Sequence, residues 1–412
     1  MRRAATPSFH LVLMNKVRKL IIGAALLIAV LPSLAQKKEI GDARELIKTG
    51  DYAKAEKILT RLLKKDSANR QNPRIYDLWL SSVEGQYNQA NEKFFLKQKA
   101  DSAAFFALTK RMFDVALTLD SLDARPDERG RVKIEYRKAN SKTLNLMRPN
   151  LYNGGTYHVG KDQYEEAYDF FDHYLDAARQ PLFSAYQYAT TDKRMPQAAY
   201  WATYCGYKLQ KPDLILHYSQ LAQQDSRRAK FVLQYVCEAY QLQKEQARYL
   251  SALHDGFRQF PLYQYFFPRL ADHYMAENRN DSLLALADKG LEADSTATLF
   301  LMAKSLALLN MERYAECIAV SKKMIALNDK QPEPYFNIAT CYLNQALEIE
   351  QQGGLRKQRD ELKQLYTDAR PYMETYRKLV PGDQKRWAPA LYRIYLNLNM
   401  GREFEEIDRL MR

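Results

Sequence analysis

Residues 298–331, TLFLMAKSLALLNMERYAECIAVSKKMIALNDKQ, form one unit of a pattern that recurs at a step of 34 residues. Over residues 267–343 the pattern places a large residue first, a small residue four positions later, and a leucine or tyrosine three positions after that. These three slots are filled by Phe267, Leu301 and Tyr335, by Ala271, Ser305 and Ala339, and by Tyr274, Leu308 and Tyr342, and Leu291 recurs as Ile325. A period of this length is typical of a repeat built from two helices.

The spacing within one unit predicts two helices that face each other. Positions i, i+4 and i+7 lie on one side of a helix, so the three slots form one buried stripe, and the small residue lets the second helix approach. In residues 298–331 the facing stripe of the second helix consists of Tyr314, Cys317, Ser321 and Ile325. Pro332 follows, where a helix starts and a missing N–H costs least.

These residues resemble the tetratricopeptide repeat (TPR), whose pattern combines a bulky residue, a small residue and a tyrosine with Tyr-x-x-Ala and a terminal proline. The Tyr-x-x-Ala element matches best at Tyr52 to Ala55, Tyr164 to Ala167 and Tyr366 to Ala369, and Tyr314 to Cys317 is a near match. The resemblance extends over most of residues 36–412, although Gly206 stands where an aromatic residue is usual. It implies an all-α, TPR-type α-solenoid, a right-handed superhelix of antiparallel helix pairs. An irregular helical bundle is the alternative.

The N-terminus has the pattern of a cleavable signal peptide. Residues 15–19 contain three basic residues, residues 20–30 form a short apolar core, and Ser33 and Ala35 are the small residues before a cleavage site. This pattern predicts a start at Met14 and a mature chain from Gln36. An uncleaved membrane anchor is the alternative, but the apolar run is shorter than the roughly 20 residues of a membrane-spanning helix. The sequence therefore predicts an exported protein, periplasmic or secreted and soluble, without a span in the mature chain.

The charge of the chain bears on its partners. The formal net charge is +13, and residues 1–35 carry five basic and no acidic residues, so the mature chain has +8. Export makes nucleic acid a poor explanation for this excess. A mildly basic surface favours acidic proteins or anionic envelope polymers, mainly through the encounter rate. A generic basic surface without a dedicated partner is the other interpretation.

The chain is expected to have four parts. Residues 1–35 are the signal peptide, 36–73 the first TPR-like unit, 74–147 an atypical helical block with a loop over residues 120–131, and 148–412 an array of TPR-like units. A hairpin is inserted at about 346–365, where Gly353-Gly354 predicts the turn. A short, charged helix at the end of the chain caps the array.

The sequence contains no catalytic or cofactor motif. It lacks a nucleophile elbow, a glycine-rich phosphate loop and a metal-binding histidine pair at i and i+4. His158 and His173 fall on the two helices of one unit, and a metal or acid-base role there is a minor alternative to packing. Gly154-Gly155 lies on a small-residue slot, which predicts close helix packing and no ligand loop. We therefore expect no enzyme, no cofactor and no metal.

Four cysteines remain in a chain whose predicted compartment permits disulfides. Their spacings match no zinc or redox motif, and Cys317 and Cys341 fall on slots that bring two neighbouring helices together. Cys205 and Cys237 complete the set. Buried free thiols are favoured over a disulfide.

A group of aromatic residues marks the candidate binding site. In such arrays the first helices line the concave groove, and the inward positions of the unit from Pro196 are Tyr200, Tyr204, Tyr207 and Lys208. Neighbouring units add Tyr152 and Tyr240. Tyrosines beside a cation make an adaptable contact surface. The alternative is that several of them are helix-contact residues.

The predicted function is that of an exported, non-enzymatic TPR scaffold that binds a protein or peptide in its concave groove. The resemblance implies protein–protein interaction, and stacked hairpins make a long surface without an enclosed catalytic cavity. The alternative is a module for an envelope glycan or polysaccharide, on which the tyrosines stack. The sequence leaves the oligomeric state open.

Overall fold

The computed structural model describes residues 36–352 and 358–412, and all regular elements in these ranges are helical. The predicted signal peptide and the Gly353-Gly354 turn lie outside the described residues. The chain divides into two compact units, Met1–Tyr235 and Val236–Arg412, which are described separately below.

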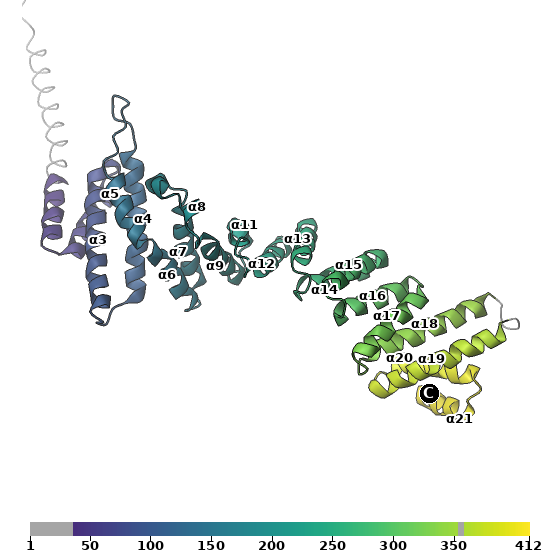
Figure 1. Ribbon diagram of the computed structural model, residues 1–412. Coiled ribbons are helices and arrows are strands. Elements are labelled where there is room, and N and C mark those ends of the chain that lie inside the picture. The colour runs from purple at the N-terminus through teal and green to yellow at the C-terminus, as the bar shows by residue number, and fades with distance from the viewer. Residues whose placement is uncertain (1–35, 353–357) are drawn as a thin grey trace, which may run out of the picture. The chain divides into compact units, whose positions relative to one another are not determined.

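The first unit is built from helices that pack against their neighbours in sequence (Figure 1). Its described part begins with a helix over residues 36–48. The following helices are α2 (Tyr52–Lys65), α3 (Pro73–Phe95), α4 (Ser102–Asp123), α5 (Arg137–Met147), α6 (Pro149–Val159), α7 (Tyr164–Asp176), α8 (Tyr188–Thr191), α9 (Met195–Lys208), α10 (Pro212–His217) and α11 (Ser219–Ala222), with the 3₁₀ helices η1 (Ala68–Gln71) and η2 (Pro181–Tyr186).

The second unit follows the same arrangement of sequence neighbours. The boundary between the units falls within α12 (Ala229–Leu242). The remaining helices are α13 (Gln246–Gln259), α14 (Phe266–Ala276), α15 (Asn280–Ala293), α16 (Thr298–Asn310), α17 (Tyr314–Leu327), α18 (Pro332–Gln351), α19 (Arg359–Leu379), α20 (Gln384–Asn397) and α21 (Gly401–Met411).

The turns between paired helices repeat one backbone conformation. The residue two positions before the second helix is left-handed in Gly50, Asp162, Gln210, Lys244, Asn278, Glu312 and Asn399. In each turn the next N–H donates to a carbonyl five residues earlier, as Arg313 does to Leu308, which satisfies a helix end that would otherwise be unpaired. Four consecutive turns, from Gln210 to Glu312, are spaced by 34 residues. The repeat period read from the sequence is therefore also a period of the backbone.

The predicted slots are the places where the helices meet. Ala271, Ser305 and Ala339 are buried, as are the large residues Phe267 and Leu301. The last residue of each Tyr-x-x-Ala element is fully buried, and α2, α7 and α17 each begin at the tyrosine of that element. These helix pairs confirm the prediction of an all-α, TPR-type solenoid.

Two details differ from the expected pattern. Met324 is buried and closes the inner stripe of α17, whereas Ile325 is only half-buried. A loop was expected from Asp120, but α4 continues to Asp123, because Asp120 is held at the helix end by an ion pair with Arg137, with Nε 2.7 Å from Oδ1. The buried carboxylate gains two charge-assisted hydrogen bonds that the pattern of apolar residues did not reveal.

The glycine pair Gly154-Gly155 packs as predicted. A Cβ atom added to Gly154 would lie 2.8 Å from the ring of Phe170, and one added to Gly155 would lie 2.6 Å from the ring of Phe171. Because both rings belong to α7, the two glycines allow α6 and α7 to approach closely. The interpretation as a helix-packing site is confirmed.

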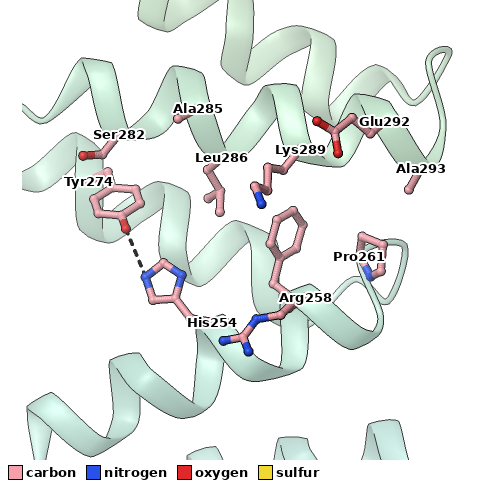
Figure 2. Close-up of a pocket in the computed structure, with 11 residues that line it drawn as sticks. His254, Arg258, Pro261, Tyr274, Ser282, Ala285, Leu286, Lys289, Glu292 and Ala293 are labelled. Atoms are coloured by element: carbon pink, nitrogen blue, oxygen red, sulfur yellow. Dashed lines mark hydrogen bonds between the residues drawn. The ribbon is translucent and has the colours of Figure 1, made fainter.

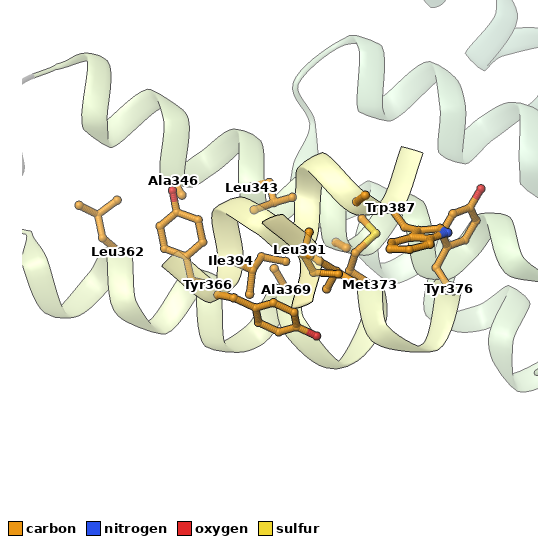
Figure 3. Close-up of a cluster of buried hydrophobic side chains, with 14 residues drawn as sticks. Leu343, Ala346, Leu362, Tyr366, Ala369, Met373, Tyr376, Trp387, Leu391 and Ile394 are labelled. Carbon is orange, nitrogen blue, oxygen red and sulfur yellow. The ribbon is translucent and has the colours of Figure 1, made fainter. Parts of the chain in front are cut away.

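A core of the second unit lies near the C-terminus. Figure 3 shows the buried side chains of α18, α19 and α20 gathered between the helices, with Tyr366, Met373 and Tyr376 on α19. The helices α18 and α19 have 20 and 21 residues, whereas α16 and α17 have 13 and 14. Ile407 of the terminal helix α21 is also buried in this core. In residues 36–352 and 358–412, none of the helices has the length and apolar character needed to cross a membrane.

Candidate functional site

Helix α9 separates small residues from aromatic ones, and this separation creates the candidate site. Its buried residues include Ala198, Ala199, Ala202, Thr203 and Gly206, and the helix packs on α7, α10 and α11. Tyr200, Tyr204 and Tyr207 follow at i, i+4 and i+7 and therefore share one stripe of the helix. The small residues fix the helix against its neighbours, so the aromatic stripe has a rigid backing.

The aromatic rings of α9 form a connected group, here called the α9 cluster. The ring centroids of Tyr200 and Tyr204 are 6.3 Å apart and stacked, and Trp201 lies 5.6 Å from Tyr204. Tyr235 of α12 lies 6.1 Å from Tyr204 and 4.4 Å from Tyr207. The members of the cluster are Tyr152, Tyr164, Tyr200, Trp201, Tyr204, Tyr207 and Tyr235. Such contacts between rings stabilise the fold by more than the burial of their apolar area alone.

Two cations adjoin the rings. The Lys208 Nζ atom lies 5.4 Å from the ring centroid of Tyr164 and 5.9 Å from that of Tyr204. The Arg228 guanidinium lies 5.1 Å from the ring of Tyr200 and also pairs with Asp225 at 2.7 Å. Lys208 is exposed, and no ion pair to it occurs in the described part of the chain. Its charge therefore remains available to an anionic group beside the rings.

Burial divides the cluster into a base and a surface. Tyr200 and Tyr235 are 8% and 7% exposed, so they belong to the core. Burial, followed by the neighbouring tyrosines, raises the pKa of Tyr235 above its usual value, which keeps the phenol neutral. Trp201, Tyr204 and Tyr207 are half-buried. Both interpretations of the tyrosines therefore apply: Tyr200 is a helix-contact residue, and Tyr204 and Tyr207 reach the surface.

Tyr152 and Tyr240 have different neighbours. The ring of Tyr152, on α6, lies 5.6 Å from Phe171; burial raises its pKa, and a hydrogen bond from Trp201 opposes the rise. Tyr240 lies in the second unit, with the Arg248 guanidinium 5.9 Å from its ring. Tyr235 of α12, which the sequence pattern did not single out, makes ring contacts with Tyr204 and Tyr207. The binding role of Tyr240 stays a prediction.

The second unit contains a groove of about 740 Å³ lined by α13, α14 and α15. Figure 2 shows His254 and Arg258 on one side and Leu286 and Lys289 on the other. The His254 Nε2 atom is 3.0 Å from the hydroxyl of Tyr274. Burial, followed by the charge of Arg258, lowers the pKa of His254. The imidazole is therefore neutral near pH 7 and suited to accept the tyrosine proton in a hydrogen bond.

The remaining histidines of interest have separate partners. The Nδ1 atom of His158 is 2.7 Å from Gln163, and its ring stacks on Phe170. The Nε2 atom of His173 is instead 2.8 Å from a carboxylate oxygen of Asp114. The structure thus gives each residue a packing or ion-pair role and does not bring them together. Within residues 36–352 and 358–412 no three His, Cys, Asp or Glu residues are arranged to hold a metal ion.

All four cysteines are buried free thiols. Cys317 and Cys341 lie in one buried cluster with Leu308 and Tyr314, so the expectation that these two cysteines are neighbours is confirmed. The Cys317 Sγ atom is also 3.4 Å from the hydroxyl of Ser305. Burial raises the pKa of the Cys205 thiol to about 12, which keeps this thiol in its unreactive protonated form.

Comparisons with known proteins identify similar folds. No family model matches the chain, and no curated protein matches it. Among solved structures, the C-terminal part of a TPR repeat-containing protein from Cytophaga hutchinsonii is similar with a TM-score of 0.39 and 11% identity, over 62% of this chain and 92% of that one. Yeast Tom70 has a TM-score of 0.31 and 12% identity, over 87% and 88%. The TPR2AB domain of yeast Sti1 has a TM-score of 0.28 and 13% identity, over 77% and 99%.

Proposed function

We propose that the protein is a non-enzymatic scaffold that binds an extended peptide or protein segment across the surface of the α9 cluster. The observation that carries the proposal is the half-buried set of Trp201, Tyr204 and Tyr207 beside the exposed Lys208. Large rings of limited conformational freedom lose little entropy on binding, and tryptophan and tyrosine are enriched among residues that dominate binding energy. The rings therefore supply contact area, and the lysine selects an acidic group of the bound segment.

The alternative ligand is a glycan of the cell envelope, for which the same rings would act as stacking platforms. A sugar ring and a peptide compete for the same apolar area, so one surface serves both hypotheses. They differ in the role of Lys208, because a neutral sugar gains nothing from its charge. Replacement of Lys208 by Gln therefore weakens binding of an acidic peptide but leaves binding of a neutral polysaccharide unchanged.

Export is part of the proposal and rests on residues 1–35, with a basic segment, an apolar core and small residues before position 36. Export would place the protein, and therefore its partner, in the cell envelope or outside the cell. Mass spectrometry of the protein purified from its native cells tests it. A mature N-terminus at Gln36 is expected, and a chain that retains the apolar core would contradict export by cleavage.

A peptide-display selection tests binding directly. A phage-displayed library of random peptides is selected on the wild-type protein, and individual peptides are titrated against the variant Tyr204→Ala with Tyr207→Ala. Loss of two large contact rings should weaken binding at least about 30-fold, because truncation of a dominant aromatic residue costs about 2 kcal/mol or more.

A matched control separates binding from folding. Tyr335 and Tyr372 are also half-buried, with ring centroids 6.4 Å apart, and they lie in the second unit. The variant Tyr335→Ala with Tyr372→Ala should bind the selected peptides like wild type, while both variants keep wild-type helical circular dichroism. Equal binding by all three proteins would refute the assignment of the site to the α9 cluster.

A further inference from the structure

The turn between α3 and α4 exposes contiguous apolar side chains. Helix α3 ends at Phe95, and Phe94, Phe95 and Leu96 are 37%, 84% and 54% exposed. Figure 1 shows this turn at the end of the two long helices, which pack side by side. Scattered apolar residues on a surface are ordinary, but adjacent ones surrounded by polar residues mark an interaction site. Residues 93–99 are here called the α3–α4 tip.

The tip is held in place by rings beneath it. The ring of Phe94 packs edge-on against Phe105 of α4, with centroids 5.1 Å apart, and Phe105 in turn stacks on Tyr87 of α3 at 4.8 Å. The backbone turns at Lys97, which is left-handed, and Asp101 caps α4 by accepting a hydrogen bond from the N–H of Ala104 at 3.1 Å. Phe94 is therefore an anchor. Phe95 and Leu96 remain exposed, and the fold gains no buried apolar area from them.

Lysines surround the exposed apolar residues. Lys93, Lys97 and Lys99 are all exposed, and none has an ion-pair partner in the described ranges 36–352 and 358–412. Residues 93–100 contain no acidic residue; Glu92 precedes the tip, and Asp101 is engaged as the cap of α4. The extremity of the hairpin is consequently apolar at its centre and positive at its edge.

We propose that the α3–α4 tip docks on an anionic lipid surface. Phe95 and Leu96 enter the boundary between headgroups and acyl chains, and the three lysines lie level with the lipid phosphates. A bilayer presents an apolar layer beneath an anionic one, and this order matches the tip, since the long lysine side chains reach back from the apolar residues to the headgroups. A fluid bilayer can also rearrange around a convex tip, so the binding surface does not need a cavity of matching shape. The contact is peripheral and reversible, and it is independent of the α9 cluster.

Vesicle co-sedimentation tests the proposal. The mature protein is sedimented with phosphatidylcholine vesicles and with vesicles that contain about 30% phosphatidylglycerol, at low and at physiological salt. We expect binding to the anionic vesicles alone and weaker binding at the higher salt. The variant Phe95→Ser with Leu96→Ser should lose at least about 10-fold in partitioning, because the buried apolar area is removed.

Charge variants test the second half of the arrangement. Each of Lys93→Gln, Lys97→Gln and Lys99→Gln should weaken partitioning roughly 5-fold, the factor that corresponds to about 1 kcal/mol for a basic residue near an anionic surface. The matched control is Leu146→Ser, because Leu146 on α5 is 75% exposed and lies outside the tip. This control should partition like wild type.

Insertion is measured separately with Phe95→Trp. On anionic vesicles its emission should shift to shorter wavelength and be quenched by brominated acyl chains, beyond any change in the wild-type protein with its three tryptophans. Absence of sedimentation with anionic vesicles at low salt would overturn the proposal, as would undiminished binding of Phe95→Ser with Leu96→Ser. The proposal would also be overturned if the wild-type protein formed an oligomer in the absence of lipid and the double variant did not. The tip would then be a contact between copies of the chain.

Discussion

At the scale of single residues, buried charges hold the parts of the first unit together. Arg148 is 4% exposed and lies between the rings of Tyr174 and Tyr188, with its guanidinium 3.8 Å from each ring centroid. The guanidinium donates to the carbonyl of Tyr174 at 2.9 Å and to Asp192 at 2.6 Å. One side chain thus ties α7 to the segment before α9. Burial of a charge is costly unless the charge is paired and hydrogen-bonded, and these contacts supply that pairing.

His173 provides a pH-dependent test at this scale. Burial opposes its charged form, but hydrogen bonds to Asp114 and Asp169 raise its pKa to about 10. A pKa raised on folding stabilises the protein fully below the unfolded value near 6.5, and this stabilisation is lost as pH rises through about 10. Replacement by Gln should therefore cost about 2 kcal/mol near pH 6 and much less above about pH 10.

Urea unfolding of wild type and His173→Gln across this pH range measures the effect. The wild type should lose more stability than the variant between about pH 6 and pH 10, because only the wild type loses a charged imidazole. Asp169 stays ionised throughout, since hydrogen bonding to His173 lowers its pKa to about 2. Parallel pH profiles for the two proteins would show that the histidine is neutral in the fold.

At the scale of helices, a glycine decides how closely α10 approaches α9. A Cβ atom added to Gly206 would lie 2.7 Å from the backbone nitrogen of Ile215 and 2.8 Å from the carbonyl carbon of Leu214. Backbone atoms cannot move aside as a flexible side chain can. The sequence pattern treated Gly206 as a departure from the usual aromatic residue, and the structure supplies the reason: the second helix is in contact at this point.

A pair of glycine variants tests this contact. Gly206→Ala should destabilise the protein by about 2 kcal/mol, the cost of overpacking less the gain in helix propensity. The control is Gly41→Ala in the helix over residues 36–48, where an added Cβ atom meets nothing within 4 Å. This substitution should stabilise by about 0.5–1 kcal/mol. Thermal unfolding of both variants is the measurement, and similar shifts in Tm would contradict the close approach of α10.

At the scale of the whole molecule, the repeated helix pair was predictable and the details of the site were not. The period of 34 residues and the Tyr-x-x-Ala elements predicted where α2, α7 and α17 begin and which small residue each of them buries. Tyr366 lies within α19, which begins earlier, at Arg359. The buried Arg148 and the ion pair of Asp120 were not predictable, since their partners lie 17 or more residues away in sequence. Long-range polar contacts leave no local periodic signal.

The candidate site was predicted in part for a similar reason. The stripe of Tyr200, Tyr204 and Tyr207 follows from helical spacing, which can be read from a single sequence. Tyr235 was missed because its contacts with Tyr204 and Tyr207 of α9 depend on how the buried residues of α12 pack, which helical spacing does not show. Trp201 was missed because it lies one position off the tyrosine stripe of α9, and helical spacing does not show its hydrogen bond to Tyr152 of α6.

The central claim is that the protein acts by binding a protein segment across the α9 cluster, and photo-crosslinking tests it most directly. A photoreactive phenylalanine analogue replaces Tyr204 in the native cell, and the same analogue replaces the exposed Leu146 of α5 as the control site. Mass spectrometry then identifies the adducts. We predict one or two discrete protein adducts from position 204 that position 146 does not give. A folded protein that gives no protein adduct at 204, or the same adducts at both positions, would contradict the account.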